Sequence, residues 1–102
     1  MKRSLDAIEI ESLLPTAPLW QLDRSMEFPA LQRAVVFAAE AQAEAFLRAL
    51  ETLANRLDHH PQARIDGAIC TVRWWTHEPP GLSQLDFECA RQTDRLLNAE
   101  PS

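Results

Sequence analysis

Several residue types that build common active sites are scarce in this sequence. Glycine occurs only at Gly67 and Gly81, which excludes both a Gly-x-Gly-x-x-Gly nucleotide loop and a phosphate-binding P-loop. Lysine occurs only at Lys2, so the chain has no interior lysine that could form a Schiff base. Tyrosine is absent altogether.

Long apolar runs and strong basic patches are also missing. No segment approaches the roughly 18 apolar residues of a membrane span, so we expect no membrane partner. The first five residues contain no apolar stretch, and an acidic residue, Asp6, follows them. We therefore expect no signal peptide and a cytoplasmic location. The formal net charge is −5, and no basic stripe could follow a phosphate backbone. We therefore expect no nucleic-acid partner.

Cysteine usage favours buried thiols. Cys70 and Cys89 have eighteen residues between them and form no Cys-x-x-Cys pair, which argues against a thiolate zinc site. A single disulfide is the alternative to two buried thiols in a reducing cytosol. With 102 residues, of which 46% are hydrophobic and 25% charged, the chain reads as one globular domain over residues 1–102.

Hydrophobic periodicity predicts the order of the elements. Residues 20–28 alternate with period two, as in a half-buried strand, whereas residues 38–57 lack glycine and proline and place apolar residues at helical spacing. We expect, in chain order, a helix over 5–14, strands over 20–28 and 31–37, a helix over 38–57, a strand over 65–76 and a helix from 84 to about 97. This α-β-β-α-β-α order predicts a two-layer α+β fold, with a small antiparallel sheet covered by helices on one face.

Local signals refine these boundaries. Ser4 is placed as the N-cap of the first helix, and Gly67 suggests a bulge or a close backbone approach in the third strand. Ser83 and Asp86 match a capping box at the start of the last helix. In the third strand the four residues Cys70, Val72, Trp74 and Thr76 share one face.

The three histidines lie in two short loops and form a candidate site. His59 and His60 follow the long helix, and His77 follows the third strand. Imidazole titrates near neutral pH, so a histidine cluster around one cavity would suit proton transfer. Three alternatives stay open: His59 caps its helix, the three histidines bind zinc, or they are unrelated surface residues. Adjacent histidines rarely point at one ion, so we expect no metal site.

Three segments resemble the pterin-4a-carbinolamine dehydratases. They are Leu57-Asp58-His59-His60-Pro61, Thr76-His77-Glu78 and Gly81-Leu82-Ser83-Gln84-Leu85-Asp86, within a resemblance covering about residues 13–97. It implies that water is eliminated from 4a-hydroxytetrahydropterin, a reduced pterin related to tetrahydrobiopterin, to give quinonoid dihydropterin. No cofactor is expected. Such a lyase needs an acid for the departing hydroxyl and a base for a ring N–H proton.

The resemblance also implies roles for named residues. His59 and His77 match the acid/base pair and His60 the residue that positions the pterin, which makes all three catalytic candidates. Asp86 matches the family's trailing aspartate, with helix capping as its alternative or additional role. Asn55, Glu78 and Trp75 are further candidates for binding the substrate, and we expect a homodimer or homotetramer.

Two departures from the family pattern keep a second function open. Asn55 stands where the family usually has an acidic residue, and residues 62–68 lack the aromatic side chains that usually follow the His-His-Pro segment. An amide cannot stabilise an imidazolium with a full charge. The alternative is a non-catalytic dehydratase-like assembly factor or chaperone for a protein client, such as Rubisco in α-carboxysomes. Whether the chain is an enzyme stays undecided by the sequence.

Overall fold

The computed structural model describes residues 3–98 and confirms the predicted α+β class and the order of its elements. Within that range the sheet has four strands in the order β1-β2-β4-β3, and all neighbouring strands are antiparallel. The elements are α1 (Ala7–Leu13), the 3₁₀ turn η1 (Leu14–Thr16), β1 (Gln21–Asp23), β2 (Ala30–Val36), α2 (Glu40–Leu57), β3 (Gln62–Asp66), β4 (Ile69–Trp74), β5 (Thr76–His77), β6 (Pro80–Gly81) and α3 (Gln84–Asn98).

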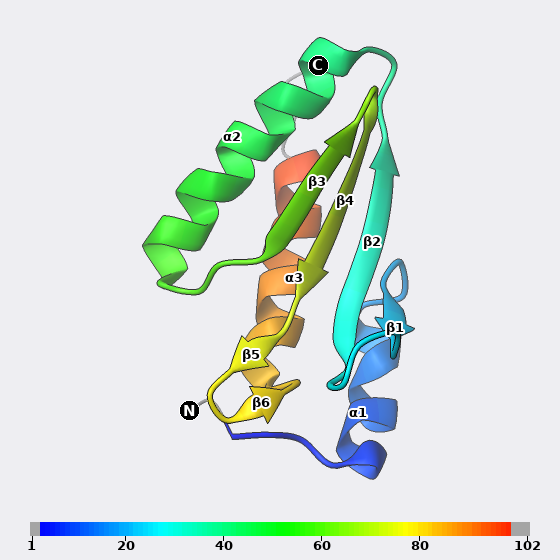
Figure 1. Ribbon diagram of the computed structural model, residues 1–102, viewed down its shortest axis with the longest axis vertical. Coiled ribbons are helices and arrows are strands. Elements are labelled where there is room, and N and C mark those ends of the chain that lie inside the picture. The colour runs from blue at the N-terminus through cyan, green and yellow to red at the C-terminus, as the bar shows by residue number, and fades with distance from the viewer. Residues whose placement is uncertain (1–2, 99–102) are drawn as a thin grey trace.

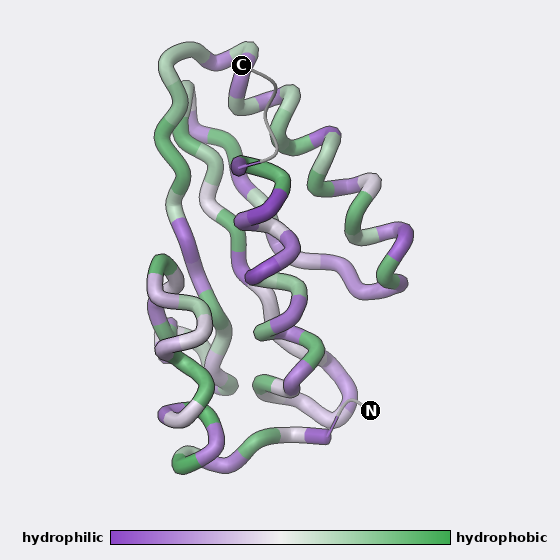
Figure 2. The backbone as a smooth tube through the Cα atoms, turned by 180° about the vertical axis from the view of Figure 1, so that it is seen from behind, coloured by the Kyte–Doolittle hydropathy of each residue, from purple (hydrophilic) through white to green (hydrophobic). Residues whose placement is uncertain are grey.

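The helices cover one face of the sheet, as predicted. The strands lie in front of α3 in Figure 1, and from behind α1 and α3 lie in front of the strands (Figure 2). The core forms between these layers from side chains that are at most 1% exposed, among them Leu31, Leu50, Val72, Trp74 and Phe87. Each such side chain stabilises the fold by about 1.5–3 kcal/mol relative to exposure. Within residues 3–98 the opposite face of the sheet carries no helix.

The single strand predicted over residues 65–76 is wrong, because this part of the chain belongs to a hairpin. β3 and β4 pair from Gln62↔Arg73 to Asp66↔Ile69, and the two residues between them form the turn. Gly67 has φ +61°, a conformation that glycine adopts without the steric cost of a Cβ. Gly67 is therefore a turn residue and not a bulge.

The N-terminal boundaries also differ from the prediction. The N-cap of α1 is Asp6, not Ser4: the Asp6 carboxylate accepts from the Glu9 N–H at 2.8 Å, and Glu9 accepts from the Asp6 N–H at 3.0 Å. The strand predicted over 20–28 pairs only at 21–23. Asp23 accepts the Ser25 N–H at 3.0 Å, a local turn that competes with continuing the strand.

Other expectations are met within the described residues. Cys70 and Cys89 are both buried thiols, and burial raises the pKa of the Cys70 thiol because the charged form loses its solvation. Trp74 faces the core, as its strand position predicted. Between residues 3 and 98, no helix has the length and apolar character needed to cross a membrane.

Candidate active site

The end of α2 turns the first candidate histidine into the core. Asp58 adopts the left-handed conformation with φ 54°, and the His59 N–H donates to the Ala54 carbonyl at 3.1 Å. A left-handed residue of this kind commonly ends a helix, and Asp tolerates it better than most side chains. The backbone therefore reverses at Asp58 and directs the His59 ring inward.

His59 forms a buried pair with Asp86, which lies in the first turn of α3. Nε2 of His59 lies 2.7 Å from Oδ1 of Asp86, and the two side chains are 5% and 0% exposed. A carboxylate only accepts hydrogen bonds, so this contact places the imidazole proton on Nε2. Asp86 thus fixes the Nε2 side of the imidazole.

The second oxygen of Asp86 is held by the start of α3. Oδ2 accepts the Ser83 backbone N–H at 2.9 Å and the Thr76 hydroxyl at 2.8 Å. The Ser83 hydroxyl lies 3.2 Å from the same oxygen and 2.8 Å from the Thr76 hydroxyl. Of the predicted Ser83–Asp86 capping box, the bond from the Ser83 N–H to the Asp86 carboxylate is present, whereas the Asp86 N–H donates to the Ser83 carbonyl and not to its hydroxyl. A negative charge suits this positive end of the helix dipole. Oδ1 contacts the imidazole while Oδ2 caps the helix, so capping leaves the other oxygen in contact with His59.

Trp74 fixes the plane of the imidazole. The His59 and Trp74 rings stack with centroids 5.7 Å apart and an interplanar angle of 13°. The indole N–H of Trp74 donates to the Thr93 hydroxyl at 3.0 Å, and that hydroxyl donates to the Cys89 carbonyl at 2.7 Å. The stacking surface is therefore anchored to α3, which holds the His59 ring on two sides.

His60 lies outside this buried group. Its Nε2 is 2.9 Å from Oδ1 of Asn55, so the amide oxygen accepts the imidazole N–H. His60 is exposed and lines a hollow of about 240 Å³ between α2 and β3, together with Glu51 and Pro61. Asn55 therefore contacts a candidate histidine, but through a neutral acceptor.

His77 lies on the two-stranded ribbon of β5 and β6, and its ring contacts that of Trp75, which precedes the ribbon. The two ring centroids are 4.9 Å apart and tilted by 52°. Trp75 is half-buried, whereas His77 and Glu78 are exposed. His77 thus contacts Trp75, and His60 contacts Asn55. The hypothesis of one cavity shared by all three histidines stays a prediction.

Sequence reasoning missed two contributions to this site. Trp74 and Thr76 were expected only to face inward, yet one stacks on His59 and the other holds Asp86. A threonine at an inward strand position next to a candidate histidine was the available signal, because a buried hydroxyl needs a partner. No group of three or more His, Cys, Asp or Glu side chains within residues 3–98 is arranged to hold a metal ion.

Comparison with known proteins identifies a matching family and similar sequences. Residues 3–96 match the family described as pterin 4 alpha carbinolamine dehydratase. A protein of Marinobacter nauticus, provisionally named pterin-4-alpha-carbinolamine dehydratase, is 40% identical over 86% of this chain and 79% of its own length. A protein of Microcystis aeruginosa with the same provisional name is 38% identical over 94% of this chain and 83% of its own.

Two solved structures share the fold. A transcriptional coactivator/pterin dehydratase from Brucella melitensis superposes with a TM-score of 0.83 and 27% identity, covering 91% of this chain and 97% of that one. A pterin dehydratase-like protein identified as a RuBisCO assembly factor in the alpha-carboxysome gives a TM-score of 0.63 and 23% identity, covering 76% and 87%. At that identity the second likeness shows the fold alone.

Proposed function

Since the chain belongs to the pterin-4a-carbinolamine dehydratase family, we propose that it eliminates water from a 4a-hydroxytetrahydropterin. The bond between carbon 4a and the hydroxyl oxygen breaks, and an acid supplies the proton with which the oxygen leaves as water. A base removes one ring N–H proton, and the electron pair of that N–H bond forms the new double bond of the quinonoid dihydropterin. The step involves no net oxidation and needs only a proton donor and a proton acceptor.

The observation that carries this proposal is the His59–Asp86 pair. With its proton held on Nε2, the ring offers the Nδ1 lone pair as a base. After Nδ1 has accepted a proton, the adjacent carboxylate stabilises the imidazolium, which can then act as an acid. Four contacts orient Asp86, so little reorganisation is needed when the charge forms.

The two exposed histidines receive supporting roles in the proposal. His77 is the partner of His59 in proton transfer, with Trp75 supplying an aromatic surface beside it and Glu78 a nearby polar group. His60, held by Asn55, positions the pterin. The family pattern supports these assignments, and the neutral contact at Asn55 predicts weaker catalysis than an acidic residue would give there.

Stopped-flow decay of 4a-hydroxytetrahydropterin tests the proposal. We expect wild-type protein to accelerate the decay, and we expect His59→Gln and His77→Ala each to lower the catalysed rate by about 10²–10⁴-fold, the usual contribution of one acid or base. Asp66→Asn, which removes an exposed carboxylate at the β3–β4 turn, is the control and should keep the wild-type rate. No acceleration by folded wild-type protein would exclude the enzyme.

A second candidate function is a non-catalytic assembly factor for a protein client. The departures at Asn55 and across residues 62–68 support it, because they remove a charge and an aromatic wall that a pterin site would use. The expected homodimer or homotetramer would fit either function and is measured by light scattering. If Rubisco large subunit is absent from proteins captured in the native lysate while the stopped-flow assay is positive, the enzyme is favoured.

A further inference from the structure

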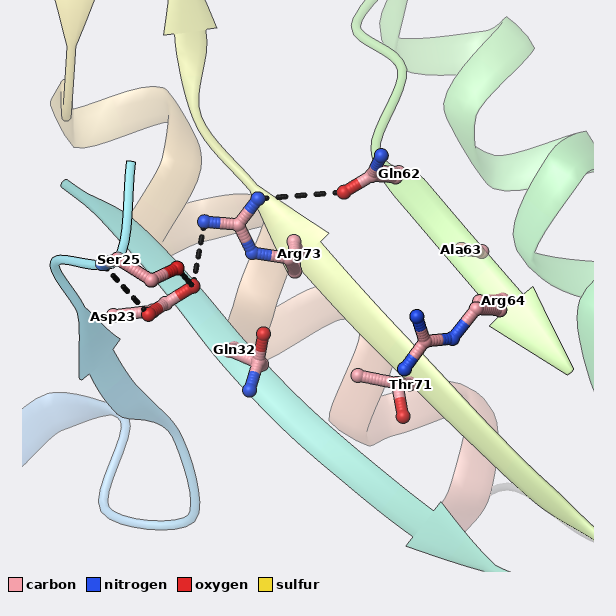
Figure 3. Close-up of a pocket in the computed structure, with 8 residues that line it drawn as sticks. All are labelled: Asp23, Ser25, Gln32, Gln62, Ala63, Arg64, Thr71 and Arg73. Atoms are coloured by element: carbon pink, nitrogen blue, oxygen red, sulfur yellow. Dashed lines mark hydrogen bonds and ion pairs between the residues drawn. The ribbon is translucent and has the colours of Figure 1, made fainter. Parts of the chain in front are cut away.

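The open face of the sheet carries a polar hollow that the proposed dehydration does not use. Its volume is about 370 Å³, within the range of small-molecule sites. Two arginines line it, Arg73 on β4 and Arg64 on β3, and Figure 3 shows Arg73 directed toward Asp23 and Arg64 toward Thr71. Strand register explains this placement, because Arg64 pairs with Thr71 and Arg73 follows two residues later on the same face.

Arg73 is buried with few strong acceptors. It is only 8% exposed, and its one anionic contact is Asp23, whose Oδ2 lies 2.6 Å from Nη2. Nη1 donates to the Gln62 amide oxygen at 3.3 Å and to the Met26 thioether at 3.0 Å, which is a weak acceptor. Nε is buried without a hydrogen-bond partner. A guanidinium has five donors, so this one retains capacity for a further anionic oxygen.

Arg64 is the second cation of the hollow and has no partner. Its exposed side chain forms no hydrogen bond or ion pair with any residue from 3 to 98. The acidic groups near the two arginines are Asp23 within the hollow, Glu27 in the adjoining hollow, and Asp66 two residues along β3. Of these three acidic residues, Asp23 alone forms an ion pair with Arg73 or Arg64 in the described part of the chain. The hollow therefore keeps an excess of positive charge in a chain whose net charge is −5.

The remaining lining groups favour a small polar ligand over an apolar one. Ser25, Gln32, Gln62 and Thr71 supply hydroxyl and amide groups around the arginines. A planar guanidinium binds carboxylate and phosphate oxygens in pairs, and convergent hydrogen-bonding groups then fix the ligand's orientation. The pterin ring system itself carries neither a carboxylate nor a phosphate.

We propose that this hollow binds a small organic anion through Arg64 and Arg73. The anion carries a doubly charged oxyanion head, which is either a dicarboxylate or a phosphate ester. Its oxygens contact Arg64 and replace the Met26 thioether at Arg73; Met26 is 55% exposed and can move aside. Asp23 stays paired with Nη2 and keeps the Arg73 side chain over the sheet.

Nitrogen-15 NMR titration of the full chain with sodium malonate or inorganic phosphate tests this site, with sodium chloride at equal ionic strength as the reference. We expect a saturable shift of the Arg73 Nε–H signal with at least one probe. Saturation by malonate alone assigns a dicarboxylate, and saturation by phosphate alone assigns a phosphate ester. Shifts that match sodium chloride, or that stay linear, overturn the proposal.

Two matched variants make the test specific. Arg64→Gln removes an exposed cation that makes no ion pair with residues 3–98, so the fold should persist while the anion binds about three- to tenfold more weakly. Arg48→Gln removes an exposed cation from α2, outside the hollow, and should leave the affinity unchanged. Equal affinity of Arg64→Gln and wild-type protein also overturns the proposal.

Discussion

Replacing Asp86 by asparagine should move the proton of His59 from one ring nitrogen to the other. Three of the four groups around the Asp86 carboxylate, from Thr76 and Ser83, gather at Oδ2. In Asp86→Asn the amide oxygen should occupy that position, because the Ser83 N–H can only donate and the two hydroxyls can donate to it as well. The amide NH₂ would then face His59 Nε2, now 2.7 Å from Oδ1. A donor in that place forces Nε2 to accept and puts the proton on Nδ1.

This substitution should lower the catalysed rate strongly and the stability of the fold only moderately. Loss of a charge-assisted hydrogen bond in a buried network should lower the free energy of unfolding by about 1–3 kcal/mol, which urea denaturation measures. The catalysed dehydration rate should fall by about 10²–10⁴-fold, because Nδ1 no longer carries a lone pair. Long-range ¹⁵N–¹H NMR of the His59 ring reports the tautomer directly. A folded variant with the Nδ1–H tautomer and an unchanged rate would refute the role of His59 as base.

Further predictions concern stability measured by urea denaturation at 25 °C. Asp23→Asn should cost about 2–4 kcal/mol at neutral pH, because it leaves the Arg73 charge without an anionic partner. Hydrogen bonds from Ser25, and then the Arg73 charge, hold the pKa of Asp23 below its usual 3.8, so wild-type stability should fall as the pH drops below about 4, whereas the variant should lack this part of the slope. Thr93→Val should cost about 1–3 kcal/mol by removing the acceptor of the Trp74 indole, and a neutral result would contradict the anchoring role. Gly67→Val should cost about 1–2 kcal/mol, because a β-branched residue is strained at φ +61°.

The fold class was predictable because the spacing of apolar residues shows which side of each helix or strand is buried. The long helix was predicted from residue 38 and begins at Glu40, and the last helix begins after Ser83 as its capping pair indicated. The β3–β4 turn was not found, although the sequence contains Asp66-Gly67, a dipeptide that often marks a hairpin. The residues on either side of it are also compatible with one continuous strand. Turn chemistry is local, and here two residues decide between one strand and two.

The sequence indicated candidate site residues but not the partners of their side chains. The family-like segments pointed to His59, His60, His77 and Asp86, and spacing alone suggested that Asp86 caps α3. The contact between Asp86 and His59 joins residues 27 positions apart and depends on how α2 and α3 pack. Periodicity assigns a residue to a face and does not choose its neighbour across the core.

The two faces of strand β4 carry residues of the two proposed sites. Successive strand residues point to opposite faces, so Arg73 lies over the open hollow while Trp74 stacks under His59 on the helix side. The Arg73 guanidinium lies 5.3 Å from the ring centroid of Trp75, which contacts His77, so the two proposed sites adjoin there. Arg64 and Asp86 share no hydrogen-bond or ion-pair partner in the described residues. Substitutions at Arg64 and Asp86 should therefore be additive in stability, within about 0.5 kcal/mol for independent sites. A larger deviation would mean that the sheet transmits strain between its faces, and anion binding would then alter the dehydration rate.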